Sequence, residues 1–426
     1  MELKAEKSIL RGRVRIPGSK SHTIRAVALA SLADGESEII VPLESADTAA
    51  AVRCYGGLGA RIECGQTWRI QGMGGQPRPP ENVIDVGNSG TTLRFGLGSA
   101  ALLQEGAAVI TGDEQIRARP LGPLMKSIND LGGQCYSTQD NGKSPIVVRG
   151  RLKGGRTQIE AITSQYLSSL LINTPLADGD SVIDVTKLNE QPYIEMTLKY
   201  LDEQNIRYKR QGWSRFEIEG RQRYKPFRRR IPADFSSATF FLCAGAILEG
   251  ELVLEGLDFS DTQGDKAVVE ILKNMGVDIE IGDGELTVRR GELRGIDIDL
   301  NATPDALPAL AVVGCFAKGK TRLYNVPQAR LKETDRIAVM ATELGRMGAK
   351  IKELPDGLMI EQSTLRPGQL NGHSDHRVVM ALSLAAMALA GETAIDTAEA
   401  VAVTFPDYVE LMQSVGGRIS VENVVL

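Results

Sequence analysis

The chain has 426 residues and a formal net charge of −5, and 42% of its residues are hydrophobic. This length exceeds what one ordinary hydrophobic core supports and predicts two domains of about 200 residues each. The acidic balance argues against a nucleic-acid-binding protein, which normally carries a basic excess. The locally basic segment 221–230 has neither zinc-ligand spacing nor heptads, so we expect a surface strand or linker there.

The positions of the cysteines and the lengths of the apolar runs indicate the cellular compartment expected for this protein. The five cysteines lie far apart, without a CxxC spacing or a partner histidine, so neither a disulfide framework nor a zinc site is expected. Such usage is typical of a reducing cytoplasm. The first residues, MELKAEKSIL, do not form a signal-peptide pattern. The longest apolar run, 378–390, is too short to span a bilayer and predicts a buried helix.

Four apolar helical runs follow hydroxyl or Asx residues that we expect to cap them. The presumed starts, in chain order, are 21–25, 88–94, 163–165 and 234–237. Helix N-termini bind phosphate and carboxylate groups well, because they offer free N–H groups and a partial positive charge. One cap alone would indicate only helix stability. Together with seven interspersed cations, the starts predict a site for more than one anionic group; the cations are Lys20, Arg25, Arg94, Arg119, Lys332, Arg336 and Arg377.

Internal repetition organises the chain. Six helical stretches end in a similar stop and turn into a short strand: LGARI, LGGQC, QNIRY, MGVDI, MGAKI and VGGRI. Their second residues are 73, 73, 71, 72 and 68 residues apart and are Gly59, Gly132, Asn205, Gly276, Gly348 and Gly416. Glycine or asparagine can adopt the left-handed conformation that ends a helix. The spacing predicts six units of about seventy residues, each with helices and with strands such as 285–290 and 357–362.

Six units suit two domains of three units each and an α+β fold. No GxGxxG follows a strand and no GxxxxGK[ST] occurs, so dinucleotide and P-loop folds lack support. Similar segments at 16–20 and 231–235 flank a block of about 200 residues and predict the two strands of a hinge. We therefore expect one discontinuous domain, 1–19 with 233–426, and a second domain, 20–232.

Two charged segments, LKETDR at 331–336 and SDHR at 374–377, stand before apolar helical runs. Lys332 and Arg336 would share a face if the first segment is helical, with Glu333 beside them. Such an arrangement would hold an anionic ligand and set a carboxyl group against it. Either segment alone would favour the simpler interpretation of a solvated, capped helix start.

The acid and base candidates are Asp305, Glu333 and His376. Asp305 alone would read as an ordinary residue in the first turn of a helix, whereas His376 lies between an acidic and a basic neighbour. No metal-ligand cluster accompanies them, so we expect proton transfer and electrostatic stabilisation. Gly90, in NSGTT, either lets a ligand approach the backbone or only permits a tight turn.

Eight motifs carry a family resemblance: PGSKSHTIRA, GNSGTTLR, RARPLGPL, TSQYLSSLL, PDALPALAV, LKETDR, SDHR and TFPDY. In this order they resemble the 5-enolpyruvylshikimate-3-phosphate synthases, and the match runs over essentially the whole chain. The resemblance implies a two-domain inside-out α/β barrel of six βαβαββ-type units, three per domain. It also implies a transferase of the shikimate pathway, which leads to chorismate and the aromatic amino acids.

The implied reaction transfers the enolpyruvyl group of phosphoenolpyruvate to shikimate 3-phosphate and releases phosphate. It runs by addition and elimination through a tetrahedral intermediate, and the family uses no metal or organic cofactor. The resemblance further implies a cytoplasmic monomer without nucleic-acid or membrane partners. Closure of two helix-lined domains on two anions would exclude water.

The resemblance also assigns site residues. Those implied for phosphoenolpyruvate are Lys20, Asn88, Gly90, Thr91, Arg119, Gln165, Glu333, Arg336, His376 and Arg377. Those implied for shikimate 3-phosphate are Lys20, Ser21, Arg25, Thr163, Ser164, Gln165, Tyr193, Asp305, Gln328 and Lys332. In the implied catalytic set, Asp305 takes the proton of the attacking hydroxyl and Glu333 protonates the methylene carbon. Lys20 and His376 complete this set.

Three positions depart from a common pattern of the family. Glu190 stands where a phosphate-contacting serine is often found, Gln328 replaces a frequent asparagine, and Val403 replaces a lysine of many members. A carboxylate that faces a phosphate would repel it, so Glu190 either points away or its loop contacts the phosphate differently. The departures leave room for a different acceptor.

Two alternatives compete with this interpretation. A UDP-N-acetylglucosamine enolpyruvyl transferase would share the fold and the donor, but its lysine is usually followed by asparagine, whereas Ser21 follows Lys20 here. Its reactive loop cysteine falls at Glu114. A non-catalytic anion-binding relative would be expected to lose its acids and bases, whereas Asp305, Glu333 and His376 are present.

Overall fold

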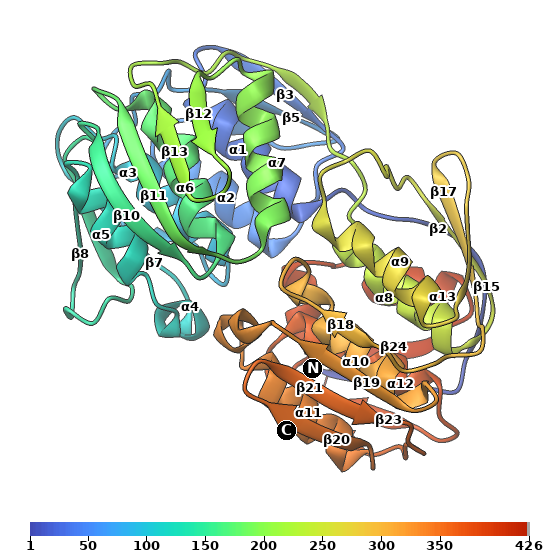
Figure 1. The fold of residues 1–426 in the computed structure, drawn as a ribbon. Helices are drawn as coiled ribbons and strands as arrows, with labels where there is room; N and C mark the ends of the chain where they lie inside the picture. The colour runs from blue at the N-terminus through green and yellow to red at the C-terminus, as the bar shows by residue number, and fades with distance from the viewer. Residues whose placement is uncertain (424–426) are drawn as a thin grey trace. The chain divides into compact units, whose positions relative to one another are not determined.

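The computed structural model describes residues 1–423, and the chain forms two compact units. Unit 1 contains residues 1–17 and the chain from 232 onward, and unit 2 contains residues 18–231. The chain therefore leaves unit 1 after its first two strands, builds unit 2, and returns (Figure 1).

Unit 2 holds three four-stranded sheets, in the orders β14-β3-β5-β4, β6-β7-β9-β8 and β10-β11-β13-β12. The strands are β3 (Glu36–Ile40), β4 (Arg61–Glu63), β5 (Thr67–Gln71), β6 (Ile84–Asp85), β7 (Ala107–Thr111), β8 (Gln134–Ser137), β9 (Ile146–Arg149), β10 (Gly155–Ala161), β11 (Ser181–Leu188), β12 (Tyr208–Gln211), β13 (Arg215–Ile218) and β14 (Arg228–Arg230). The helices are α1 (Lys20–Leu32), α2 (Ala46–Gly57), α3 (Gly90–Ala100), α4 (Glu114–Ala118), α5 (Gly122–Asp130), α6 (Ser164–Asn173), η1 (Thr174–Leu176) and α7 (Gln191–Glu203).

Unit 1 repeats this plan with the orders β16-β17-β15-β2, β18-β19-β21-β20 and β22-β23-β1-β24. The strands are β1 (Glu2–Glu6), β2 (Ile9–Arg15), β15 (Glu249–Glu255), β16 (Asp278–Ile281), β17 (Glu285–Arg289), β18 (Asp297–Asp299), β19 (Lys320–Tyr324), β20 (Lys350–Leu354), β21 (Gly357–Glu361), β22 (Gln369–Leu370), β23 (Thr393–Ile395) and β24 (Arg418–Glu422). The helices are α8 (Phe235–Ile247), η2 (Gly264–Lys266), α9 (Ala267–Asn274), η3 (Pro304–Ala306), α10 (Leu307–Phe316), η4 (Pro327–Leu331), α11 (Arg336–Arg346), α12 (His376–Met387), η5 (Ala398–Val403) and α13 (Tyr408–Ser414).

All six sheets within residues 1–423 share one pairing pattern. In each, an edge strand pairs parallel with its neighbour and the remaining pairs are antiparallel. A buried helix links the two parallel strands where they are consecutive, as a crossover connection requires. The predicted six βαβαββ units are thereby confirmed.

Three of the sheets are completed by strands from far along the chain, one of them by β2, which pairs parallel with β15. β14, at the end of unit 2, pairs parallel with β3, and Arg229 lies opposite Ile39. β1, at the start of the chain, inserts between β23 and β24, so Leu3 lies opposite both Ile395 and Val421. The first and last repeats of the sequence are therefore closed by non-local strand pairs.

The six predicted stops are helix ends with left-handed backbone. The φ angles of Gly59, Gly132, Asn205, Gly276, Gly348 and Gly416 are +112°, +94°, +55°, +96°, +93° and +99°. At each stop, the N–H of the following residue donates to a carbonyl five positions back, as from Val277 to Leu272. This bond satisfies a carbonyl that the helix end leaves open. The C′ prediction is confirmed at all six positions.

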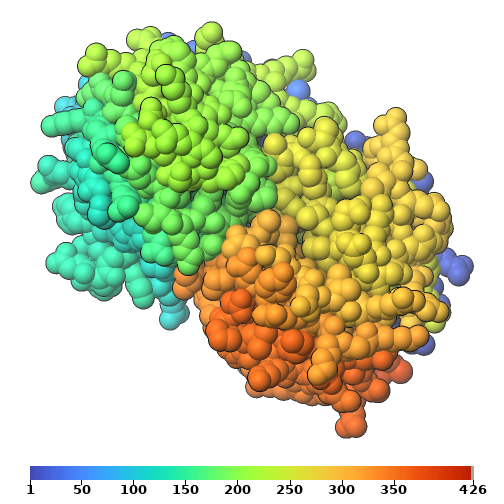
Figure 2. Space-filling view, viewed as in Figure 1, coloured from blue at the N-terminus to red at the C-terminus, as the bar shows by residue number. Residues whose placement is uncertain are grey.

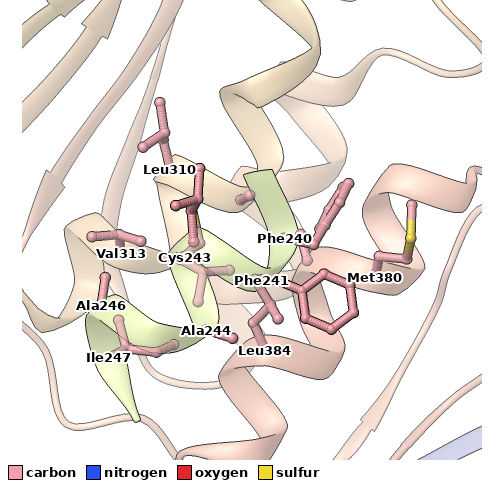
Figure 3. Close-up of a cluster of buried hydrophobic side chains, with 14 of the residues drawn as sticks. Phe240, Phe241, Cys243, Ala244, Ala246, Ile247, Leu310, Val313, Met380 and Leu384 are labelled. Carbon is pink, nitrogen blue, oxygen red and sulfur yellow. The ribbon is translucent and has the colours of Figure 1, made fainter. Parts of the chain in front are cut away.

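Three helices form the centre of each unit: α8, α10 and α12 in unit 1, and α1, α3 and α6 in unit 2. All 13 residues of α8 are buried, and α12, which begins two residues before the predicted apolar run, is buried throughout. A helix that is apolar on all sides is stable only when other elements surround it. Figure 3 shows α8 side chains, Phe240, Phe241 and Ile247 among them, packed with Leu310 of α10 and Met380 of α12.

The outer surface of each unit is formed largely by the sheets. Strands alternate buried and half-buried positions, as β17 and β13 do, so one face of each sheet covers the central helices. In the space-filling view, the yellow-green residues of β12 and β13 spread over the outer face of unit 2 (Figure 2). Among residues 1–423, no helix is long and apolar enough to cross a membrane.

Candidate active site

The predicted site residues gather where the central helices begin. In unit 2, α1 begins with Lys20 and Ser21, α3 with Gly90 and Thr91, and α6 with Ser164 and Gln165. In unit 1, Asp305 lies in the η3 turn just before α10, and α12 begins with His376 and Arg377. These positions are equivalent in the repeated topology, so the repeat brings short polar segments from distant parts of the chain to corresponding places within each unit.

In unit 1, Arg336 is the centre of a buried ionic cluster. Its Nε lies 2.8 Å from Oδ2 of Asp375 and its Nη2 lies 3.1 Å from Oδ1 of the same carboxylate. Its Nη1 donates to Asp305 over 2.8 Å, and its Nη2 also donates to Glu333. One guanidinium therefore contacts three carboxylates, and its side chain is only 1% exposed.

Two further cations complete the cluster. Arg377 Nη2 lies 3.1 Å from Asp305 Oδ2 and donates over 2.8 Å to Ser236, at the start of α8. Lys332 Nζ lies 3.7 Å from Asp305 Oδ1. Three cations thus face three carboxylates, which satisfies the general requirement that buried charges be paired.

The charge state of Arg336 follows from these contacts. Burial alone would lower the pKa of its guanidinium, but the carboxylates of Asp375, Glu333 and Asp305 outweigh burial and raise the pKa. Arg336 therefore carries a fixed positive charge beside the two predicted acid–base carboxylates.

The LKETDR segment is not one continuous helix, although a shared helix face for Lys332 and Arg336 was considered from the sequence. Lys332 follows the η4 turn, Glu333 lies in the turn after it, and α11 begins only at Arg336. Asp335 caps α11, because its Oδ1 accepts from the N–H of Ala338 over 3.0 Å. From this turn, Lys332 and Arg336 both reach Asp305, and Arg336 also contacts Glu333 and Asp375. These contacts do not depend on Lys332 and Arg336 sharing one face of a helix.

In unit 2, Lys20 has a buried acidic partner. Its Nζ lies 2.9 Å from Oδ2 of Asp47, whose side chain is 8% exposed, in the first turn of α2. The other carboxylate oxygen of Asp47 is buried without a hydrogen-bond partner among the described residues. The buried carboxylate pairs with the ammonium of Lys20 and restrains its side chain.

Gly90 lies beneath two guanidinium groups. A Cβ atom added there would lie 2.6 Å from Nη1 of Arg94 and 2.6 Å from Nη1 of Arg119. Arg94 Nη1 also donates to the Gly90 carbonyl over 3.0 Å. The two interpretations offered for Gly90 were a close approach of a ligand to the backbone and a tight turn. In the structure, the groups that approach Gly90 closely are two buried arginine side chains of the protein itself.

Arg25 is fully enclosed between α1, α6 and α7. Its guanidinium donates to Thr197 Oγ1 over 2.9 Å and to the Tyr193 carbonyl over 3.1 Å. The group lies 5.4 Å from the centre of the Phe95 ring and 5.9 Å from that of Tyr193. Burial lowers the pKa of Arg25 to about 10, so it remains a cation at neutral pH.

Polar side chains of α3 and α6 meet directly. Gln165 Nε2 donates to Thr91 Oγ1 over 3.0 Å. Asn88, just before α3, donates to Asp113 and to Gln115, both over 2.6 Å. Arg119, at the end of α4, is 7% exposed. Together with the approach of Arg119 to Gly90, these contacts place five predicted residues beside the start of α3: Asn88, Gly90, Thr91, Arg119 and Gln165.

The expected helix caps are only partly present. Thr163 accepts from the N–H of Gln165 at α6, and Asp234 accepts from the N–H of Ser237 at α8. The N-cap residues of α1 and α3 are Ser19 and Ser89, and neither makes a side-chain cap bond. The cap prediction is thus wrong for these two helices, because α1 begins one residue earlier than expected and Ser89 instead donates to Thr92.

The three departures from the family pattern have distinct environments. Gln328 is buried and its Nε2 donates to the Asn301 carbonyl over 3.0 Å. Val403 ends the η5 turn and is half-buried. Glu190 is 2% exposed and its carboxylate turns onto the first residues of α6. The Glu190 carboxylate therefore faces Thr163 and Ser164, two of the residues that the resemblance implies for shikimate 3-phosphate.

Sequence reasoning missed the partners of the predicted cations. Asp375, Asp47 and Ser236 were not assigned to the site, although each contacts an assigned residue. Asp375 had a local signal, because it stands next to His376 and Arg377 in SDHR. Asp47 and Ser236 are 27 and 141 residues from their partners, so no local pattern could have paired them.

Comparison with known proteins gives the family. The model of the family described as EPSP synthase (3-phosphoshikimate 1-carboxyvinyltransferase) matches residues 4–412. The chain belongs to the EPSP synthase family.

Relatives in this family match over nearly their full length. The 3-phosphoshikimate 1-carboxyvinyltransferase of Acetivibrio thermocellus is 55% identical over 421 residues, which cover 99% of each chain. That of Ruminiclostridium cellulolyticum is 52% identical and covers 98% of this chain and 99% of its own. An archaeal relative from Methanothrix thermoacetophila is 45% identical, with coverages of 98% and 99%.

Solved structures of EPSP synthases have the same fold. An EPSP synthase from Acinetobacter baumannii superposes with a TM-score of 0.84 at 27% identity, covering 99% of this chain and 100% of that one. A second structure of an Acinetobacter baumannii EPSP synthase gives 0.82 at 26% identity, with the same coverages. The predicted inside-out α/β fold of repeated units is confirmed.

Proposed function

We propose that this protein transfers the enolpyruvyl group of phosphoenolpyruvate to the 5-hydroxyl of shikimate 3-phosphate and releases phosphate. The observation that carries the proposal is the buried contact of Arg336 with both Asp305 and Glu333. Through this contact, a permanently charged guanidinium that can bind an anionic substrate lies beside two carboxyl groups that can accept or donate protons.

The addition step uses the two carboxylates in opposite directions. The 5-hydroxyl oxygen bonds to carbon 2 of phosphoenolpyruvate, Asp305 accepts the hydroxyl proton, and Glu333 donates a proton to carbon 3. In the elimination step, the bond from carbon 2 to the phosphate oxygen breaks, and Glu333, now a carboxylate, takes a proton from carbon 3, which restores the double bond. The proton held by Asp305 goes to the departing phosphate, so both carboxyl groups return to their starting states. Proton exchange between positioned carboxyls and substrate contributes about 10²–10⁴-fold in such reactions.

The electrostatics of unit 1 favour these roles. Lys332, Arg336 and Arg377 are already balanced by Asp305, Glu333 and Asp375. An incoming carboxylate or phosphate adds negative charge beside Glu333, and a like charge favours the protonated form of a carboxyl group. Binding of phosphoenolpyruvate would thereby prepare Glu333 as an acid, and His376 would support the charge balance from the start of α12.

Unit 2 supplies the remaining proposed contacts. Lys20, Gly90 and Arg119 would hold phosphoenolpyruvate, together with Asn88, Thr91 and Gln165. The residues proposed to hold shikimate 3-phosphate are Ser21, Arg25, Thr163, Ser164, Gln165 and Tyr193, together with Gln328 of unit 1. The supporting observation is that six of these residues, Lys20, Ser21, Gly90, Thr91, Ser164 and Gln165, lie in the first turns of α1, α3 and α6, where backbone N–H groups attract anions.

The test is phosphate release from phosphoenolpyruvate, measured with and without shikimate 3-phosphate, in the presence of EDTA. The expected result is release that requires the acceptor and is unaffected by the chelator. Release without acceptor, or none with it, would contradict the proposed reaction.

We further propose that the active form is a cytoplasmic monomer. All five cysteines are free thiols and four of them are buried, which fits a reducing compartment. Light scattering on the purified protein, with and without substrates, would test the oligomeric state. A dimer that persists at assay concentrations would contradict the monomer.

A further inference from the structure

Glu190 occupies anion-binding groups at the start of α6. Its Oε2 accepts from the backbone N–H of Ser164 over 3.1 Å and from the Ser164 hydroxyl over 2.7 Å. It also accepts from the Thr163 hydroxyl over 3.2 Å. One carboxylate oxygen is therefore held by three donors at a helix N-terminus, which is the environment that a phosphate oxygen would seek.

The backbone of Glu190 is also set for this contact. The residue has φ +58° and ψ +42°, a left-handed conformation that few non-glycine residues adopt, and it immediately precedes α7. A side chain at this N-cap position would ordinarily accept from its own helix. Glu190 makes no such bond to α7 and instead reaches the neighbouring α6.

Arg25 is a buried cation whose electrostatic environment includes Glu190. The guanidinium of Arg25 hydrogen-bonds Thr197, Ser168 and two backbone carbonyls, all of which are neutral acceptors. Burial lowers the pKa of Arg25, and this effect is opposed by Tyr200, by Tyr193 and, to a smaller extent, by Glu190. The Glu190 carboxylate is therefore one of the groups that favour the charged form of Arg25.

The proposed function assigns the same donors to another anion. Thr163, Ser164 and Arg25 are the groups proposed to hold the phosphate-bearing acceptor. A phosphate dianion and the Glu190 carboxylate cannot both accept from Ser164 at short range, because two like charges repel strongly in a buried site. Either the carboxylate leaves these donors or the phosphate binds less tightly.

We propose that Glu190 is a specificity-determining residue, an internal anion that the acceptor's phosphate must displace from the start of α6. The proposal rests on the proposed function, since it concerns the phosphate of that acceptor. Small anions without further contacts would fail to displace Glu190, whereas a ligand whose ring also contacts unit 2 would succeed. The carboxylate therefore reduces phosphate affinity and favours the complete substrate.

The experiment compares phosphorylated and unphosphorylated acceptor in two variants. Glu190→Ser removes the carboxylate that accepts from Thr163 and Ser164. Glu190→Gln keeps the shape of the side chain but removes its charge. Calorimetry should show shikimate 3-phosphate binding at least about tenfold more tightly to Glu190→Ser, and about threefold or more to Glu190→Gln. The dissociation constant of shikimate, which lacks the phosphate, should change less than about twofold.

Glu195→Gln is the matched control. It removes the same charge from the same helix, and its carboxylate accepts from Gln191 rather than from α6. Its affinity for shikimate 3-phosphate should equal that of the wild type. Inorganic phosphate is the acceptor-independent probe, and it should bind measurably better to Glu190→Ser than to the wild type.

Two results separate this inference from the proposed function. If phosphate release requires shikimate 3-phosphate but neither variant binds that ligand more tightly, Glu190 is not an internal competitor. If no variant supports acceptor-dependent release, the proposed reaction fails, and the inorganic-phosphate comparison still decides the role of Glu190. Equal phosphate affinity in wild type and Glu190→Ser would overturn the inference.

Discussion

Arg336 and Asp375 form a two-point ion pair that is almost completely removed from solvent, with side chains 1% and 0% exposed. Both ends of the guanidinium edge are used, at 2.8 and 3.1 Å. Asp375 also accepts from the N–H of Arg377 over 2.9 Å and thereby caps α12. One carboxylate therefore fixes the start of α12 and the guanidinium proposed to bind phosphoenolpyruvate.

Replacement of Asp375 should affect stability and substrate binding together. Asp375→Asn removes the charge that balances a buried cation, and we expect the free energy of unfolding to fall by about 3 kcal/mol. The Michaelis constant for phosphoenolpyruvate should rise, because Arg336 loses its orientation. Urea unfolding and steady-state kinetics test this, with Asp297→Asn as control, since Asp297 is 68% exposed and lies 4.0 Å from Arg322. Equal stability of the two variants would contradict the role of Asp375.

Glu333→Gln should separate chemistry from binding. The amide keeps the size of the side chain and its contact with Arg336, but it cannot deliver a proton. We expect kcat to fall by about a hundredfold or more, with the affinity for shikimate 3-phosphate nearly unchanged. Glu353→Gln is the control, since this acid is 45% exposed and pairs with Arg330. Wild-type turnover in Glu333→Gln would remove this residue from the mechanism.

Gly90→Ala should weaken phosphoenolpyruvate binding without loss of stability. The added methyl would lie 2.6 Å from guanidinium atoms of Arg94 and Arg119, so both cations must move. Alanine in a helix is otherwise favoured over glycine by about 1 kcal/mol. We expect a Michaelis constant raised several-fold and an unchanged or higher melting temperature. Gly122→Ala, where an added Cβ meets nothing within 4 Å, is the control; a parallel loss of stability in Gly90→Ala would contradict this account.

A pair of glycine variants tests the repeat stops. Gly276 has φ +96°, and a Cβ there would lie 2.4 Å from the Glu292 carbonyl oxygen. Gly284 has φ +74°, and a Cβ added there would have no atom within 4 Å. Gly284→Ala therefore measures only the free-energy cost of placing alanine in a left-handed backbone conformation. We expect Gly284→Ala to lower the free energy of unfolding by about 1 kcal/mol and Gly276→Ala by about 3 kcal/mol. Equal losses in urea unfolding would show that the carbonyl moves away freely.

Glu343 should position the loop before α12. Its carboxylate is fully buried, accepts from the Asn371 N–H over 3.1 Å, and lies 3.0 Å from His373 Nε2. His373 and Ser374 both have left-handed backbone, with φ +54° and +51°. We expect Glu343→Ala to raise the Michaelis constant for phosphoenolpyruvate about tenfold, because the loop carrying Asp375 loses its anchor.

Rescue and control variants make this last prediction specific. Glu343→Gln keeps an acceptor for Asn371 and should restore most of the affinity. Arg346→Ala removes only the 57%-exposed partner of Glu343 and should leave stability within about 0.5 kcal/mol of the wild type. Normal kinetics in Glu343→Ala would show that the left-handed residues hold their conformation without it.

The sequence carried the local part of this structure. The six stops were predicted because a helix end needs a residue that tolerates positive φ, and this requirement is visible in Gly59 or Asn205 without any partner. The apolar run that became α12 was predicted in the same way, since uniform hydrophobicity requires burial. The motifs around Lys20, Gly90 and Arg336 also located the starts of α1, α3 and α11 to within a residue or two.

Tertiary structure decided which charges meet. Arg336 contacts Asp305 and Asp375 across 31 and 39 residues, and Lys20 contacts Asp47 through the packing of α1 and α2. Such pairs depend on the relative placement of separate helices, which no periodicity encodes. For the same reason the orientation of Glu190 could not be chosen from the sequence: its donors belong to α6, and only the packing of α7 beside α6 brings them within reach.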